Sequence, residues 1–120
     1  MSKAILVVDD VADLAQICAE LLASEGYRCI HTSTVTDAMK VLADVQIDLV
    51  LTDMFMPGQS GFDLRDHIRN DKRLIGIPIV FMTGRIDQAE NTNDIVLLKP
   101  FGMDVLLRTL DKVLQKPLGN

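Results

Sequence analysis

The stretch DLVLTDMFMPGQSG, residues 48–61, contains a short apolar run, an aspartate and then a segment rich in proline and glycine. The run that ends at Asp53 has the length and composition of a strand buried on both faces. Pro57, Gly58 and Gly61 indicate a turn directly after it, and a helical pattern follows. The stretch therefore predicts a strand, a turn and a helix, with a carboxylate at the end of the strand.

Units of this kind recur along the chain. Short apolar runs predict strands over residues 5–8, 27–32, 48–53, 77–83 and 95–98. Apolar residues spaced three and four apart predict helices, with buried faces at Leu14, Ile17, Cys18, Leu21 and Leu22, at Ala38, Val41, Leu42 and Val45, at Phe62, Leu64 and Ile68, and over residues 103–114. Gly26 is expected to end the first helix and Thr34 to cap the second.

Strands that alternate with helices predict an α/β fold with a parallel sheet covered on both faces. At this size the common arrangement is a doubly wound five-stranded parallel sheet of order 2-1-3-4-5. The run over residues 27–32 is less apolar than the others. We therefore expect it at an edge of the sheet.

The composition is that of one soluble globular domain. The chain has 120 residues, 48% hydrophobic and 24% charged, so residues 1–120 are expected to form a single domain, with 115–120 a tail or the start of a linker. The net charge of −5 argues against direct nucleic acid binding, which needs clustered Lys and Arg. No apolar run could span a membrane and the first residues lack a signal peptide, so the cytoplasm is the expected location. Cys18 and Cys29 are expected to be reduced and buried.

Three aspartates are expected to meet at one edge of this sheet. Asp9 and Asp10 end the first strand and Asp53 ends the third, and ligands of open α/β sheets bind beyond the carboxyl ends of the strands. Close carboxylates repel unless their pKa values rise or a cation holds them. An all-oxygen cluster favours a hard cation, above all Mg²⁺. The alternative is that such an aspartate caps the next helix, and Asp13 is better placed than Asp10 to do so.

The fourth and fifth strands would add Thr83 and Lys99 to the same edge. Lys99 would bring a positive charge to the acidic pocket. Pro100 fixes the chain just after it, so Lys99 is expected to point back over the sheet edge. Thr83 taken alone is an ordinary hydroxyl at the end of a strand.

Four segments carry a resemblance to a known family: VVDD (7–10), LTDMFMPGQSG (51–61), FMTG (81–84) and LLKPF (97–101). Together they resemble the receiver domain of bacterial two-component response regulators. The resemblance runs from about Lys3 to Leu114, and the combination of motifs is specific. It implies a flavodoxin-like fold and a phosphoacceptor switch in a phosphorelay.

The resemblance also implies a reaction centre. Asp53 matches the phosphoacceptor, which takes a phosphoryl group from a phosphohistidine of a sensor histidine kinase or a phosphotransfer protein. Asp10 and Asp53 would bind Mg²⁺ directly together with the backbone carbonyl of Phe55, and Asp9 would act mainly through water.

Two further residues have roles in the family's reaction. Lys99 would pair with the phosphoryl oxygens, and Thr83 would move to hydrogen-bond them. Phosphorylation would change binding to a downstream protein target or to an output domain on a longer chain. The chain would then show weak self-catalysed phosphotransfer and aspartyl-phosphate hydrolysis rather than the activity of a dedicated enzyme. The alternative is a non-phosphorylated interaction module that retains the receiver fold.

The sequence departs from the family at several positions. Val96 stands where an aromatic residue is usual, and Val is short and stiff. The segment between Thr83 and Lys99 is short by about one and a half helical turns, so the fourth helix is expected to be shortened or missing. Phe55 and Arg85 flank the route of the hydrolytic water and could screen it, which predicts slow loss of the phosphoryl group.

Two other protein classes fit the sequence less well. Phosphatases and mutases with an aspartate nucleophile need a second aspartate two residues later, where this chain has Phe55. A flavin-binding domain of similar topology needs a Ser-, Thr- or Gly-rich loop after the first strand. This chain has DDVADL there, residues 9–14, whose negative charge would repel phosphate.

Overall fold

Strands and helices alternate over residues 4–83, and a further strand and helix lie within residues 95–114. The computed structural model describes residues 3–85, 87 and 94–114. The elements are β1 (Ala4–Val8), α1 (Ala12–Ser24), β2 (Arg28–Thr32), α2 (Val35–Asp44), β3 (Leu49–Asp53), α3 (Gly61–Arg69), β4 (Ile79–Thr83), β5 (Ile95–Leu98) and α5 (Met103–Leu114). All strand pairs are parallel, and the order in the sheet is β2-β1-β3-β4-β5. This confirms the α/β class and the strand order expected from the sequence.

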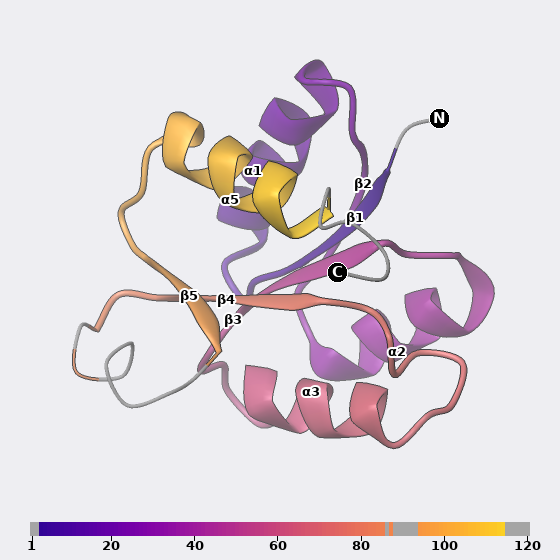
Figure 1. The fold of residues 1–120 in the computed structure, drawn as a ribbon. Helices are drawn as coiled ribbons and strands as arrows, with labels where there is room; N and C mark the ends of the chain where they lie inside the picture. The colour runs from indigo at the N-terminus through magenta and orange to yellow at the C-terminus, as the bar shows by residue number, and fades with distance from the viewer. Residues whose placement is uncertain (1–2, 86, 88–93, 115–120) are drawn as a thin grey trace.

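The sheet is the middle of three layers (Figure 1). Helices α1 and α5 cover one face, and α2 and α3 cover the other. Every residue of β1, β3 and β4 is buried, whereas β2 and β5, at the two edges, are partly exposed. The edge position predicted for the second strand is therefore confirmed.

Alternate residues of a strand serve the two halves of the core. In β1, Ile5 and Val7 belong to the cluster under α1 and α5, whereas Leu6 and Val8 belong to the cluster under α2 and α3. This follows from the two-residue period of a strand, which points successive side chains to opposite faces. A strand covered on both faces must then be apolar at every position, which explains the unbroken run AILVV.

The face that α1 buries includes the predicted Leu22, with the predicted Cys18 half-buried beside it, but the other predicted residues are not part of it. The helix buries two alanines and Leu22, while Leu14, Ile17 and Leu21 remain 50%, 52% and 46% exposed. Small residues face the sheet, so the larger side chains next to them on the helix surface stay in solvent. We call Leu14, Ile17 and Leu21 the α1 patch.

One predicted helix cap is confirmed and another is wrong. The side chain of Thr34 accepts a hydrogen bond from the Asp37 N–H at 3.1 Å and caps α2. Asp13 is not the cap of α1, which begins after Val11. The Oδ1 of Asp9 instead accepts from the Val11 N–H at 3.0 Å. A site carboxylate thus also orders the turn into α1.

The two cysteines are free, and both are half-buried beside the core rather than fully buried. Burial raises the pKa of Cys18, and it raises that of Cys29 to about 11. Both thiols are therefore protonated and unreactive at neutral pH.

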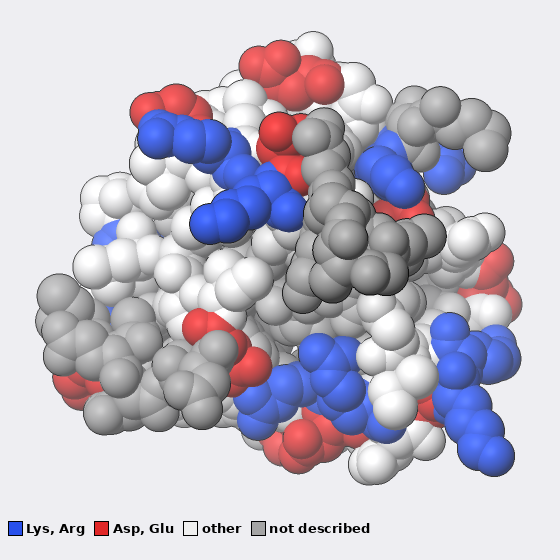
Figure 2. All heavy atoms as spheres, in the orientation of Figure 1, with Lys and Arg blue, Asp and Glu red and all other residues white. Residues whose placement is uncertain are grey.

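The expected shortening of the fourth helix falls mostly on residues 86 and 88–93, which lie outside the described residues, as do residues 115–120. Among the helices that the structure describes, none has the length and apolar character needed to cross a membrane. Basic and acidic side chains lie interspersed on the face of the molecule shown in Figure 2.

Candidate functional site

The aspartates that end two neighbouring strands lie together at the carboxyl edge of the sheet. β1 and β3 are paired in parallel with Val8 opposite Thr52, so the next residues, Asp9 and Asp53, emerge side by side. One carboxylate oxygen from each of Asp9, Asp10 and Asp53 lies within 4.8 Å of the others. Asp9 and Asp53 are 3% and 7% exposed, whereas Asp10 is open to solvent.

Lys99 reaches this acidic cluster from the end of β5. Its Nζ lies 2.7 Å from Oδ1 of Asp53 and 2.9 Å from Oδ2 of Asp9. The backbone N–H of Lys99 donates to the carbonyl oxygen of Thr83 at 2.7 Å, which extends the contact between β4 and β5 by one residue. The peptide bond between Lys99 and Pro100 is cis. One ammonium group thus bridges two buried carboxylates.

Burial and mutual contact shift the pKa values of these groups. Burial raises the pKa of Asp53 to about 7, and its hydrogen bond with Asp9 adds to the rise. Burial also opposes ionisation of Asp9, but hydrogen bonds from Asp53, the Val11 N–H and Lys99 lower its pKa below the usual value. Burial favours the neutral form of Lys99, yet its bonds to both carboxylates raise its pKa. The shifts therefore favour the charged forms of Asp9 and Lys99, and they favour the protonated form of Asp53 compared with an ordinary aspartate.

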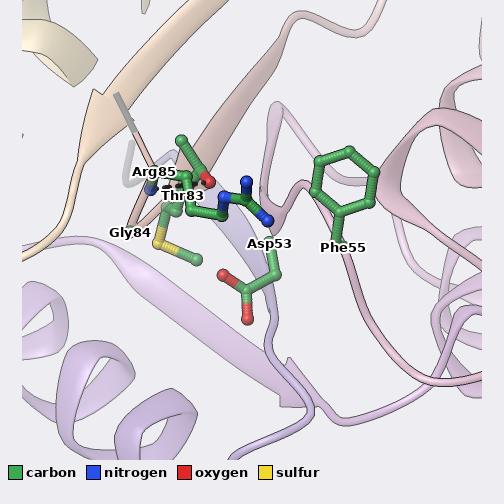
Figure 3. Close-up of a pocket in the computed structure, with 6 residues that line it drawn as sticks. Asp53, Phe55, Thr83, Gly84 and Arg85 are labelled. Atoms are coloured by element: carbon green, nitrogen blue, oxygen red, sulfur yellow. Dashed lines mark hydrogen bonds between the residues drawn. The ribbon is translucent and has the colours of Figure 1, made fainter. Parts of the chain in front are cut away.

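A pocket of about 570 Å³ opens over Asp53. Its lining consists of Asp53, Phe55, Met82, Thr83, Gly84 and Arg85. Thr83 is buried at the end of β4, and its Oγ1 accepts a hydrogen bond from the Arg85 N–H at 3.3 Å. In Figure 3 Phe55 lies across the pocket from Thr83. The side chain of Arg85 starts beside Thr83, at the end of β4, and extends toward Phe55. The pocket can therefore admit a small group to the carboxylate of Asp53.

The donor set of the acidic cluster suits a hard divalent cation. Every donor is a carboxylate oxygen, which Mg²⁺ prefers over nitrogen or sulfur ligands. A cation at the cluster would also offset both the burial and the repulsion by Asp9 that raise the pKa of Asp53. Phe55, whose carbonyl was the fourth expected ligand, lies two residues after Asp53 at the wall of the pocket.

The sequence reasoning missed a group of residues behind the pocket. Phe62 and Arg65 of α3 lie against Phe81 of β4, and Arg65 forms an ion pair with Asp94. The spacing of Phe62 and Arg65, three residues apart on one helix, was the available signal, since such residues share a helix face. The contact between Asp94 and Arg65 depends on the tertiary fold, and no sequence pattern indicated it.

A sheet of this order, with buried aspartates and a lysine at its carboxyl edge, defines the class of two-component receiver proteins. The family model for the response regulator receiver domain matches residues 5–111. The chain belongs to this family.

Relatives of known name agree with this membership. The chain is 32% identical over 122 residues to the phosphate regulon transcriptional regulatory protein PhoB of Pseudomonas aeruginosa, covering 97% of this chain and 53% of that protein. It is 30% identical to the chemotaxis protein CheY of the same organism, covering 96% of this chain and 98% of that protein. The structure of the response regulator TrrA of Thermotoga maritima, in complex with Mg²⁺ and BeF, is similar with a TM-score of 0.81 and 30% identity, covering 92% of this chain and 98% of that chain.

The chain spans about half the length of the first curated relatives that it matches. Among these, MtrA of Mycobacterium tuberculosis is named a DNA-binding response regulator; it is 35% identical to this chain, which spans 46% of it. What these relatives do with the rest of their length says nothing directly about this chain.

Proposed function

We propose that this receiver domain is a phosphoacceptor switch in which Asp53 takes a phosphoryl group from the phosphohistidine of a sensor histidine kinase or a phosphotransfer protein. The observation that carries the proposal is the bridge from Lys99 to Asp9 and to Asp53, and Asp53 also lines an open pocket. The bridge places a fixed cation beside the candidate nucleophile. The phosphorylated state then changes the binding of a downstream protein or of an output domain.

The transfer itself needs only positioning and charge. A carboxylate oxygen of Asp53 forms a bond to phosphorus while the bond from phosphorus to the histidine nitrogen breaks, and that nitrogen keeps the electron pair. Mg²⁺ held by Asp9, Asp10, Asp53 and the carbonyl of Phe55 would supply positive charge to the phosphoryl oxygens. The acid cluster is the support for this cofactor.

Lys99 and Thr83 act on the product. The acyl phosphate carries close to two negative charges and new acceptor oxygens. Lys99, already 2.7 Å from Asp53, stays paired with those oxygens. The hydroxyl of Thr83, which opens onto the same pocket, turns toward them. Conversion of Asp53 into a charged acyl phosphate thus changes the contacts at the end of β4.

The surface beside the site supports a protein as the phosphodonor. The α1 patch lines a groove of about 320 Å³, together with Phe101, Met103 and two residues of the site, Asp9 and Lys99. An apolar surface of this kind on a soluble domain commonly marks a site of protein contact. A donor protein that covers the α1 patch would bring its phosphohistidine next to Asp53.

The test is phosphorylation by a small acyl phosphate in the presence of Mg²⁺. Wild-type protein should gain the mass of one phosphoryl group in a form that hydroxylamine removes, as expected of an acyl phosphate, and Asp53→Asn should gain none. Asp10→Asn should react much more slowly. Asp13→Asn, which removes an exposed acid outside the cluster, is the matched control and should react like wild type. Equal phosphorylation of wild type and Asp53→Asn would contradict the proposal.

A further inference from the structure

Three phenylalanine rings form a continuous ladder from the pocket into the core. Phe55, at the wall of the pocket, lies edge-on to Phe62 with ring centroids 5.8 Å apart and planes at 78°. Phe62 in turn lies 5.0 Å from Phe81 at 47°. Both arrangements are favourable for aromatic pairs. Phe55 is 53% exposed and Phe81 fully buried, so the ladder leads from solvent to the centre of the sheet.

Arg65 closes the inner end of this ladder and joins it to β5. Its guanidinium carbon lies 5.0 Å from the centroid of Phe62 and 5.8 Å from that of Phe81. Its Nη1 lies 2.5 Å from Oδ2 of Asp94, the residue that precedes β5. The two side chains are only 30% and 27% exposed. Stacking and a partly desolvated ion pair therefore hold one guanidinium in place.

The start of α3 is pressed against the backbone of the phosphoacceptor. The N–H of Gly61 donates to the carbonyl oxygen of Met54 at 2.9 Å. A Cβ at Gly61 would lie 2.2 Å from the carbonyl oxygen of Asp53 and 3.1 Å from Cε1 of Phe81. There is no free space between the helix and the end of β3. A shift at Asp53 must therefore move α3, which carries Phe62 and Arg65.

The residue on β5 that faces the ladder is small. Val96 pairs with Phe81 in the sheet register and packs against the same part of the core. A valine side chain has no ring to exchange between two positions, and its χ1 angle is stiff. Contacts that can change with the state of Asp53 therefore lie on α3 and at Asp94 rather than on the side chain of Val96.

We infer that the Phe55–Phe62–Phe81 ladder and the Arg65–Asp94 ion pair couple the state of the phosphorylation site to the beginning of β5. The inference rests on the proposed function, which supplies the event at Asp53. A bound cation or a phosphoryl group displaces the backbone at residues 53–55 and the ring of Phe55, and Phe62 follows. In one state Arg65 keeps its ion pair with Asp94 and its contacts with both rings, and in the other state it loses them together. Coupling requires two discrete states of this kind.

The first experiment measures amide hydrogen exchange at residues 94–98 before and after phosphorylation with a small acyl phosphate and Mg²⁺. The variants are Arg65→Gln, which removes the guanidinium, and Asp94→Asn, which removes the charge paired with Arg65 but keeps the guanidinium, and so guards against loss of folding. Arg108→Gln breaks an exposed pair with Asp104 on α5 and is the matched control. Intact mass gives the phosphorylated fraction of every sample.

We expect phosphorylation to change exchange at residues 94–98 in the wild type and in Arg108→Gln. The change should be severalfold smaller in Arg65→Gln and Asp94→Asn at an equal phosphorylated fraction. The inference is overturned if exchange in Asp94→Asn changes as much as in the wild type. It is also overturned if exchange in the phosphorylated wild type does not change at all. The proposed function stands in both cases. Absence of phosphorylation in the wild type instead counts against the proposed function.

The second experiment does not depend on phosphorylation. Coupling between two sites is reciprocal, so loss of the Arg65–Asp94 pair should change the Mg²⁺ dissociation constant of the unmodified protein. Titration with MgCl₂, followed by amide chemical shifts, should show a change of about fivefold in Asp94→Asn, the lower end of typical coupling. The constant of Arg108→Gln should stay at the wild-type value. Equal constants in wild type and Asp94→Asn would overturn the inference.

Discussion

The ammonium nitrogen of Lys99 lies 2.7 Å from Oδ1 of Asp53, although Asp53 is the last residue of β3 and Lys99 follows β5. The same nitrogen lies 2.9 Å from Asp9, so a single cation offsets two buried carboxylates. The Coulomb attraction in an ion pair of low exposure is larger than in a surface pair, but desolvation opposes it, and removal of one partner is costly. In the proposed reaction these charges would also face the phosphoryl group.

Replacement of Lys99 by methionine should slow phosphorylation of Asp53 by about 100-fold, the typical effect of removing a preorganised charge from a transition state. The side chain keeps a similar length but offers no charge to the phosphoryl oxygens. The initial rate with a small acyl phosphate and Mg²⁺ measures the effect. Lys40→Met, on the exposed face of α2, is the control. A rate within twofold of wild type would refute the role given to Lys99.

The stability of the metal-free protein should depend on pH through Asp53. Its folded-state pKa of about 7 exceeds the usual 3.8, so between these values the folded chain holds a proton that the unfolded chain has released. Stability contributed by this group therefore falls as the pH rises through that range. Asp53→Asn has no such group, and its melting temperature should exceed that of wild type by more at pH 8 than at pH 4.5. Thermal unfolding in a chelator would show this, and a constant difference would contradict the raised pKa.

A methyl group at Gly61 should destabilise the protein by about 3 kcal/mol or more, at the upper end of the usual cost of overpacking. The added Cβ would lie 2.2 Å from the carbonyl oxygen of Asp53, and neither the strand end nor the helix start can yield cheaply. Gly76→Ala is the matched control, because a Cβ there meets no atom within 4 Å. Urea unfolding of both variants measures the difference. Similar stabilities would show that α3 and β3 can separate.

The phosphorylated protein should lose its phosphoryl group slowly. Phe55 and Arg85 both line the pocket over Asp53, and the side chain of Arg85 extends toward Phe55, so the two can obstruct an attacking water. The decay of purified phosphoprotein in Mg²⁺ should take minutes or longer, and Phe55→Ala together with Arg85→Ala should accelerate it severalfold. A wild-type lifetime of seconds would rule out the screening.

Much of the fold followed from local patterns. Unbroken apolar runs identified the buried strands, and the predicted bounds 95–98 and 103–114 agree with β5 and α5. Other predicted element boundaries were wrong by one or more residues. The second strand was expected from residue 27, but the Tyr27 N–H donates to Leu22 at the end of α1 and the strand begins at Arg28. This hydrogen bond is local and, with the turn at Gly26, closes the end of α1, so the apolar character of Tyr27 belongs to the end of the helix and not to the strand.

The buried face of α1 shows a different limit. Periodicity correctly indicated an amphipathic helix, yet it selected Leu14, Ile17 and Leu21, which are about half exposed. The pattern contains both large and small apolar residues, and the distance between helix and sheet decides which of them fit. The distance between the helix and the sheet is set when the layers assemble, so it cannot be predicted from the sequence of one helix.

The sequence by itself determined the strand-and-helix order, the family and the acids expected at the strand ends, because these depend on residue type and local spacing. Only the tertiary structure decided that one lysine bridges Asp9 and Asp53, that burial brings the pKa of Asp53 to about 7, and that Arg65 joins the aromatic ladder to Asp94. Such contacts depend on the register of neighbouring strands and on how closely helices approach the sheet. Those are distances between residues far apart along the chain, and a pattern of neighbours does not contain them.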